Sequence, residues 1–412
     1  MYKFIFSIVI FLMHIWSIQI IAQTKRVDSL ERLLNTDKMD TNRVIHLYTL
    51  SHEKRLLNDY NAALTYGLQS LQLAQEINHE RGIANSHNYI ANVYYFKGNF
   101  SEALEHQKTC LKIKQEQSDS LGMAAALNNI GAIYDKLCKY TEALNNYQNC
   151  LQIQNKINDV AGMAVTINNI GVVYEKQGLN EKAKEYHEQA LNLIQNMPSS
   201  NTDALSNIYL NVGNFYLKQN SYKEALSYYQ KYLKIKEYAG DKHQMANAYN
   251  NIGVVFEKLG NYKGAIKQHQ ACLDIMNELG NKEGMADSYN NLGVIYEKKG
   301  DYADALKIHF SSLKLQKEIS NKKGMATSYV NIGIAQTKLQ RYKDAQHYLN
   351  KGLEISKDIG SRKLIQLCYK WMANLNNQLA AADDAPINKR ETYSLKALEY
   401  TNLYNELSDS IK

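Results

Sequence analysis

Apolar and polar residues follow one another along this chain with the spacing of amphipathic helices. In residues 305–315, apolar side chains recur every three to four positions, which places them on one face of an α-helix. Another helix is predicted over residues 282–299, with Asn281 as its N-cap and Gly280 closing the helix before it. Only two prolines occur, so almost nothing interrupts the predicted helices. The pattern therefore predicts consecutive pairs of helices.

The second helix of a pair is expected to begin at a capping box, in which a side-chain acceptor stands three residues before a carboxylate. The segments 221–224 (Ser-Tyr-Lys-Glu) and 301–304 (Asp-Tyr-Ala-Asp) have this form. Gly260 and Gly300 stand directly before two such helix starts, where left-handed backbone is needed. Each unit is thus predicted to be a helix, a tight turn and a second helix.

The same helix pair returns along the chain at intervals of 40 residues. Residues 127–134 (Leu-Asn-Asn-Ile-Gly-Ala-Ile-Tyr) return with few changes at 167–174 (Ile-Asn-Asn-Ile-Gly-Val-Val-Tyr). An alanine follows each glycine of this phrase by 12 residues, and a leucine follows it by 20. The alanines are Ala143, Ala183, Ala225, Ala265, Ala305 and Ala345. Because one helix pair cannot bury its own apolar face, the stacked units are expected to share a continuous core.

This phrase is similar to the pattern of large, small and aromatic residues in the tetratricopeptide repeat family. The matching residues are Leu127, Ile130, Gly131, Tyr134, Ala143 and Tyr147. The resemblance implies an all-α fold, a right-handed superhelical α-solenoid of about nine helix-turn-helix units. The long 40-residue form resembles kinesin light chains and bacterial peptide-binding regulators. It also resembles the sensor regions of Bacteroidota histidine kinases and transcription regulators.

The repeat frame divides the chain into four predicted segments. These are a signal peptide (1–22), an N-terminal leader or cap (23–41), an array of about eight units (42–362) and a degenerate capping unit (363–412). The resemblance implies a non-catalytic scaffold that binds a protein segment or peptide in its concave groove. The alternative is the extracytoplasmic sensory region of a histidine kinase or transcription regulator whose output domain is absent from this chain.

Two columns of polar residues recur in the first helix of each unit, the helix that lines the concave face in the family. The asparagines are Asn129, Asn169, Asn211, Asn251, Asn291 and Asn331. Seven residues later come the lysines Lys136, Lys176, Lys218, Lys258, Lys298 and Lys338. Because seven residues make about two helical turns, both columns share one face.

These columns are the predicted peptide-binding groove. Asparagine amides offer the donor and acceptor needed to hold an extended peptide backbone, and the lysines would favour acidic groups on that partner. Each column also has a structural interpretation. The asparagines would then bond to a neighbouring helix, and the lysines would complement the dipole at a helix C-terminus.

The N-terminus has the pattern of a secretory signal peptide: Lys3, an apolar run over residues 4–21, and Ala22 before a polar segment. Cleavage after Ala22 would export the chain to the periplasm or cell envelope of a Gram-negative, Bacteroidota-like bacterium. The alternative is an uncleaved anchor, since the run approaches the length of about 20 residues that spans a bilayer. A membrane is expected as a partner only in that case, or if a segment beyond this chain spans one.

Charge and composition exclude other functions. The 48 basic and 41 acidic residues leave a formal charge of +7, and both signs alternate along the chain. Without a basic arm or patch, no nucleic-acid partner is expected. No nucleophile–base set, phosphate loop or carboxylate pair rises above the repeat background, so we expect no enzyme and no cofactor.

The histidines and cysteines also follow the repeat. His187, His269 and His309 share one position in successive helix pairs, which lie about 10 Å apart in packed helices. Zinc needs ligands within about 2 Å, so we expect these rings to pack between helices and to bind no metal. Three cysteines share a position that is small in the sister units, and we expect them to be packing thiols: Cys110, Cys150 and Cys272.

Overall fold

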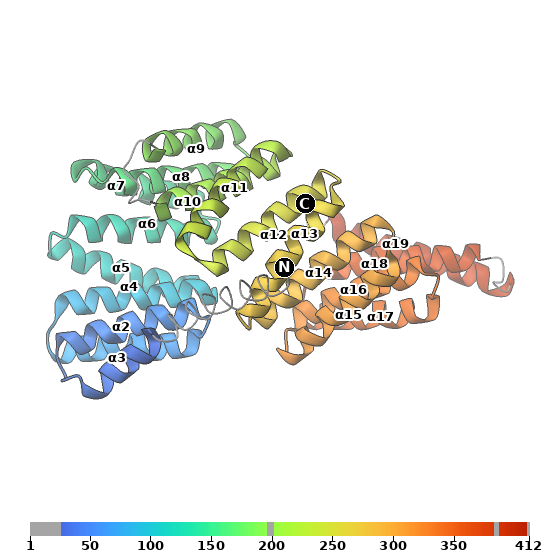
Figure 1. Ribbon diagram of the computed structural model, residues 1–412, viewed down its shortest axis with the longest axis horizontal. Helices are drawn as coiled ribbons and strands as arrows, with labels where there is room; N and C mark the ends of the chain where they lie inside the picture. Colours follow the sequence, from blue (N-terminus) through green and yellow to red (C-terminus); the bar gives the residue numbers. More distant parts are fainter. Residues whose placement is uncertain (1–25, 196–201, 383–386, 410–412) are drawn as a thin grey trace, which may run out of the picture. The chain divides into compact units, whose positions relative to one another are not determined.

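The structure, a computed structural model, describes residues 26–195, 202–382 and 387–409. Within these ranges every regular element is an α-helix, which confirms the predicted all-α fold (Figure 1). The helices divide into two compact units, one ending at Gln219 and the other beginning at Asn220.

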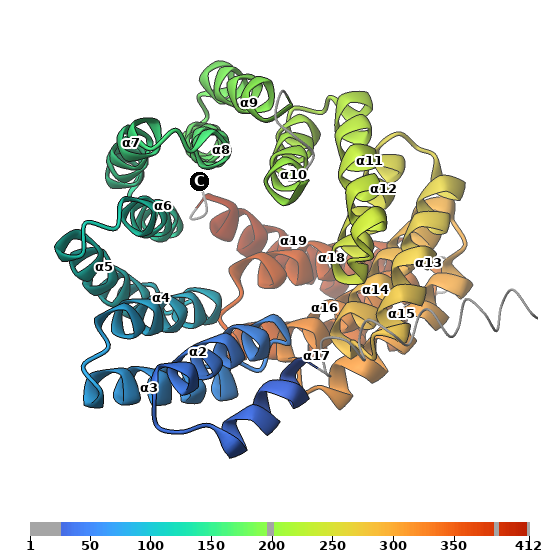
Figure 2. The ribbon, with the colours of Figure 1, turned by 60° about the vertical axis from the view of Figure 1, so that its left-hand side comes forward.

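The N-terminal unit opens with a helix over residues 26–36 and continues as helix pairs. Its further helices are α2 (Thr41–Leu56), α3 (Tyr60–Glu76), α4 (Glu80–Lys97), α5 (Phe100–Glu116), α6 (Ser120–Lys136), α7 (Tyr140–Lys156), α8 (Val160–Lys176), α9 (Asn180–Gln195) and α10 (Thr202–Lys218). Each even-numbered helix from α2 to α8 packs on the one that follows it, and α10 packs against α8 and α9. Figure 2 shows α4, α6, α8 and α10 on the inner side of the curve of this unit, and α5, α7 and α9 on its outer side.

The C-terminal unit repeats this arrangement. Its helices are α11 (Tyr222–Ala239), α12 (Lys242–Lys258), α13 (Tyr262–Glu278), α14 (Lys282–Lys299), α15 (Tyr302–Glu318), α16 (Lys322–Lys338), α17 (Tyr342–Asp358), α18 (Arg362–Ala381) and α19 (Ile387–Asp409). Here α11 packs against α12, and α12 to α19 form four pairs. The segment predicted as a degenerate capping unit is thus the last of these pairs, α18 on α19.

The two helices of a pair begin in different ways. In α14, the Asn281 side chain accepts a hydrogen bond of 2.9 Å from the backbone N–H of Gly284, as predicted. The predicted capping boxes give the right starts for α11 and α15 but the wrong bonds, since neither Ser221 nor Asp301 accepts a cap bond with its side chain. The Asp301 carboxylate pairs with Lys299 at 2.7 Å instead.

Small residues bring the helices of a pair close together. The alanines of the repeat are fully buried: Ala143, Ala183, Ala225, Ala265, Ala305 and Ala345. The glycine of the repeated phrase makes room for a large side chain from the second helix. A Cβ on Gly131 would lie 2.6 Å from Cε1 of Tyr147, and one on Gly293 would lie 2.3 Å from Cε1 of His309. Any other residue would collide there, which explains why glycine returns in the phrase.

The cysteine prediction is confirmed. Cys110, Cys150 and Cys272 are buried free thiols, and the Cys150 thiol donates a hydrogen bond to the carbonyl oxygen of Ala124 at 3.1 Å. The predicted signal peptide, residues 1–22, lies outside the described residues. None of the helices that the structure describes is long and apolar enough to cross a membrane.

Candidate functional site

All twelve residues of the predicted groove lie on first helices of their pairs, namely α6, α8, α10, α12, α14 and α16. In the N-terminal unit these are the helices on the inner side of the curve (Figure 2). The six asparagines are buried or half-buried, and the six lysines are exposed. The two columns therefore share one face, as predicted, with the asparagines set deeper than the lysines.

The asparagines form a hydrogen-bonded ladder between successive first helices. In four of the six, the side-chain Nδ2 donates to Oδ1 of an asparagine that precedes it by 41 residues. The pairs are Asn129 to Asn88 (3.1 Å), Asn169 to Asn128 (3.0 Å), Asn291 to Asn250 (2.7 Å) and Asn331 to Asn290 (2.6 Å). In each of these bonds, the acceptor is the first asparagine of the phrase in one unit, and the donor is the second asparagine of the phrase in the next unit. The bonds hold the amides in a row along the face.

The ladder is interrupted around the division between the two units. Within the described residues, neither Asn211 nor Asn251 makes such a bond. For Asn211, the corresponding acceptor is Asn168, because two extra residues separate this unit from the one before it. The Oδ1 atom of Asn168 instead accepts a hydrogen bond of 2.9 Å from Nδ1 of His187.

The lysines pair with acidic side chains of the preceding first helix. Lys176 lies 2.5 Å from Asp135, Lys218 pairs with Glu175, and Lys298 pairs with Glu257. Two further lysine ammonium groups lie over aromatic rings: Lys136 is 6.0 Å from the ring centroid of Tyr95, and Lys338 is 5.6 Å from that of Trp371. Through these contacts the lysines hold neighbouring repeats together, and much of their charge is already paired within the protein.

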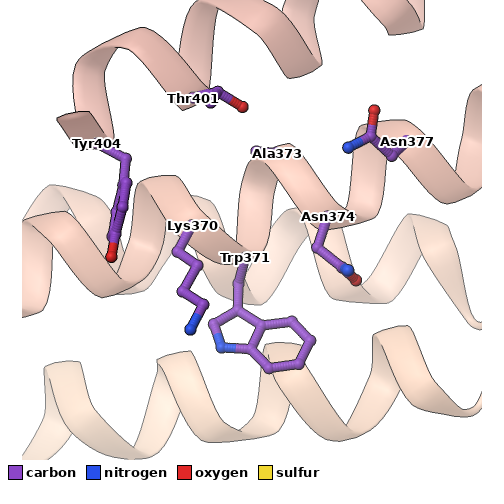
Figure 3. A pocket seen from close by; sticks show the side chains of 7 residues that line it. All are labelled: Lys370, Trp371, Ala373, Asn374, Asn377, Thr401 and Tyr404. Atoms are coloured by element: carbon purple, nitrogen blue, oxygen red, sulfur yellow. The ribbon is translucent and has the colours of Figure 1, made fainter.

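Trp371 stands 40 residues after Asn331, so it continues the asparagine column into α18. A pocket of about 260 Å³ lies beside it, lined from α18 and by Thr401 and Tyr404 of α19. Figure 3 shows the side chains of Trp371 and Asn374 leaving α18 on the same side. The last pair thus presents an aromatic ring where the other units present an amide.

Two further pockets occupy equivalent places in the two units, and sequence reasoning missed both. Each lies between successive first helices and is floored by a glutamine of the second helix between them. One has a volume of about 270 Å³ and is lined by residues that include Leu121, Ala125, Gln154, Ala161 and Val165. The other has a volume of about 200 Å³ and is lined at the matching positions by Glu283, Asp287, Gln316, Lys323 and Thr327. The first is mainly apolar and the second is charged.

The sequence pattern did not indicate these pockets because their floor lies outside the repeated phrase. The glutamines stand five residues before the N-caps Asp159 and Asn321, near the end of the second helix. The signal that could have found them is variation at this position, which holds lysine, isoleucine, methionine or serine in other units.

The repeated helix pair matches a known family. The model of the tetratricopeptide repeat matches the sequence in seven overlapping segments: 46–116, 82–156, 122–196, 162–238, 204–278, 244–318 and 284–358. The chain belongs to the tetratricopeptide repeat family. Its fold is therefore the predicted α-solenoid, and the matched family is a repeat scaffold, with no catalytic family indicated. No curated protein sequence matched the chain.

Solved structures share the tetratricopeptide repeat fold at low sequence identity. One is a signal transduction ATPase with a tetratricopeptide repeat sensor from Pyrococcus horikoshii (TM-score 0.63, 14% identity), covering 84% of this chain, which spans about half (53%) of that one. Another is RapI without ligand (TM-score 0.59, 15% identity), covering 90% of this chain and 98% of that one. A third is the ligand-free quorum sensor NprR from B. thuringiensis (TM-score 0.55, 15% identity), covering 81% and 98%. At these identities the likeness concerns the fold.

The shared histidines are buried in their repeats, each beside the glycine of its own first helix. His187, His269 and His309 are at most 1% exposed. Among the residues that the structure describes, no group of three or more histidine, cysteine, aspartate or glutamate side chains could hold a metal ion. Burial lowers the pKa of His187 and of His269 to about 4. Both rings are therefore neutral core groups at physiological pH.

Proposed function

We propose that this tetratricopeptide repeat chain is a non-catalytic scaffold that binds an extended protein segment or peptide along the asparagine and lysine columns. The asparagine ladder is the observation that carries the proposal. It fixes the amides of Asn129, Asn169, Asn291 and Asn331 on one face, and the first three of these remain partly exposed.

The ladder leaves the amides with capacity for a ligand. An asparagine side chain has two N–H donors and an oxygen that accepts two hydrogen bonds. Each ladder bond uses one donor of the second asparagine in the phrase. The remaining N–H and the oxygen can then meet the C=O and N–H of an extended backbone. An amide that is already held by its neighbour loses little side-chain entropy on binding, which favours affinity.

The lysine column contributes less to this proposal. Lys176, Lys218 and Lys298 are paired with carboxylates of the array. An acidic ligand would compete with these pairs instead of meeting free charges. We therefore propose that the lysines set the edge of the face and that acidic groups on the partner add little affinity.

The decisive test is selection of binding peptides from a random displayed library on the purified chain, followed by titration of the selected peptides. Asn169→Ala should weaken binding at least tenfold, while Asn149→Ala, an exposed asparagine on the outer helix α7, should leave it unchanged. Asn291→Ala and the exposed Asn277 of α13 form the same comparison in the C-terminal unit. Equal affinities within each pair of variants, with helical content intact, would refute the proposal.

Export to the periplasm or cell envelope is a further part of the proposal, supported by the basic, apolar and small-residue pattern of residues 1–22. An immunoblot of fractionated cells with an antibody against the repeats tests it. A soluble envelope band smaller than the 47.1 kDa precursor is expected, and a band confined to the cytoplasm would contradict it.

The alternative function is that of an extracytoplasmic sensory region in a signal-transduction protein. Two structures of the same fold are named as a repeat sensor and as a quorum sensor, which is why this alternative is retained. Both functions share the same binding face. The same immunoblot separates them, because a larger, membrane-bound band would indicate a sensor joined to an output domain.

A further inference from the structure

The two equivalent pockets differ most at their mouths. In the N-terminal unit, Leu121 and Ala125 of α6 stand at positions that Glu283 and Asp287 of α14 occupy in the C-terminal unit. Both carboxylates are exposed at the pocket mouth. The same two positions of the repeat are thus apolar in one unit and negatively charged in the other.

The floor of the charged pocket holds an acceptor without a donor. Gln316 is only 2% exposed, and its Oε1 has no hydrogen-bond partner among the described residues. Its amide nitrogen donates to Asp287, which assigns the other amide atom as the oxygen. In the apolar pocket the matching oxygen is satisfied, because Gln154 Oε1 accepts from the Thr166 hydroxyl at 3.0 Å. A buried acceptor left unpaired costs free energy, so the charged pocket favours a ligand that brings N–H donors.

Two donors that line this pocket are occupied within the protein, whereas the ammonium group of Lys323 also lines it without an ion pair among the described residues. The Ser312 hydroxyl donates to the carbonyl oxygen of Ala286 at 2.8 Å, and the backbone N–H of Gly324 donates to Oδ1 of Asn321 at 3.0 Å. The acceptors that the pocket offers to a ligand are the carboxylate oxygens of Glu283 and Asp287 and Oε1 of Gln316.

The two carboxylates differ from nearby acidic side chains in their ion pairing. Nearby acids are paired, with Lys282 on Glu318 at 2.8 Å and Lys322 on Asp358 at 2.7 Å. No ion pair of this kind holds Glu283 or Asp287 within the described residues. Lys323 also lines the pocket and acts on Asp287 from a distance. Partial desolvation, reinforced by Glu283, raises the pKa of Asp287 above its ordinary value.

We propose that the pocket formed by Glu283, Asp287 and Gln316 binds the cationic end of a lysine or arginine side chain. The inference rests on the proposed function, since it assigns a residue class to a peptide on this face. At about 200 Å³ the pocket is smaller than the roughly 300–1,000 Å³ of sites for drug-sized ligands, which suits a single side chain. A guanidinium or ammonium group would supply donors to both carboxylates and to the floor.

The probe for this site is Nα-acetyl-arginine N-methylamide, titrated into the full chain labelled with ¹⁵N-glycine. The backbone amide of Gly324 reports on the charged pocket, and that of Gly162 reports on its apolar counterpart. The uncharged citrulline analogue has nearly the same shape and is the matched ligand control. The variant E283L/D287A gives the charged pocket the residues that the apolar pocket has at these two positions. Both positions are exposed and helical, and they tolerate leucine and alanine.

The arginine probe should shift the Gly324 resonance saturably and leave Gly162 unmoved. The citrulline analogue should bind at least tenfold more weakly, and E283L/D287A should lose the response. An unmoved Gly324, an equal response to citrulline, or a response retained in the folded variant would each overturn the inference. Failure of the proposed function is a separate result, because it appears in the peptide selection and not in this titration.

Discussion

The buried His269 predicts a specific loss of stability in acid. Its side chain is fully buried on α13, and neither ring nitrogen has a hydrogen-bond partner among the described residues. Desolvation by burial lowers its pKa from 6.5 to about 4, and the only opposing effect comes from Glu257. The folded chain therefore keeps this ring neutral down to about pH 4, whereas the unfolded chain protonates it below about pH 6.5.

The direction and size of the effect follow from this difference. A histidine with a depressed pKa stabilises the fold fully above the pKa of the unfolded state, and that stability is lost as pH falls toward the pKa of the folded state. A difference of about 2.5 pKa units at 1.36 kcal/mol each corresponds to about 3 kcal/mol in total. Between pH 7 and pH 5 the loss from this one ring is about 2 kcal/mol.

Another repeat already has leucine at the position of His269, so His269→Leu is a suitable test. Leu349 stands at the matching position of α17 and packs against Gly333 in the same way that His269 packs against Gly253. In His269→Leu, the free energy of unfolding from urea titrations followed by circular dichroism should fall between pH 7 and pH 5 by about 2 kcal/mol less than in the wild type.

The refuting result is a loss of stability in His269→Leu equal to that of the wild type. Other groups also contribute in this range, such as the buried His187, and they contribute equally to both proteins. Equal losses would therefore mean that His269 is protonated in the folded chain, and the structure would then have to hold a cation in its core.

Four further substitutions test the local structure in urea titrations at pH 7. Cys138 is exposed and follows α6 with φ at +58°, so Cys138→Gly should stabilise the chain by about 1 kcal/mol, and an unchanged midpoint would contradict the left-handed backbone there. Gly293→Ala should destabilise by about 1–3 kcal/mol despite the better helix propensity of alanine, because the new Cβ would lie 2.3 Å from the buried His309 ring; a gain in stability would refute this contact. Asn281→Ala should cost about 1 kcal/mol, whereas Ser221→Ala should be close to neutral because that side chain makes no cap bond; equal costs would contradict the difference between the two caps.

The scaffold could be predicted from the sequence because every repeat contains the same local structural signals. The spacing of the phrase, Asn281 as an N-cap and the column of buried alanines each reflect contacts within one helix pair or between neighbours. The capping boxes failed for a local reason. A carboxylate such as Asp301 can pair with a nearby lysine instead of with the helix N-terminus, and pattern alone cannot decide between these partners.

The candidate site was predicted in position but not in its bonds. The sequence placed Asn169 and Lys176 on one face, and the structure has them there. Their partners, Asn128 and Asp135, lie 41 residues earlier, and only the stacking of successive helices brings them within bonding distance. The interpretation in which asparagine bonds to a neighbouring helix is therefore also met, and whether the face binds peptide remains a prediction.

The residues that vary between repeats carry more information about ligands than those that recur. The recurring glycine and alanine positions are set by helix packing, so they would be the same for any ligand. The floor position between successive first helices is also buried, yet the array fills it with different chemistry. From the second pair onward it holds Lys114, Gln154, Ile194, Lys236, Met276, Gln316 and Ser356. If the face binds an extended peptide, this series, read together with the pocket mouths above it, is where the order of side chains in that peptide is specified.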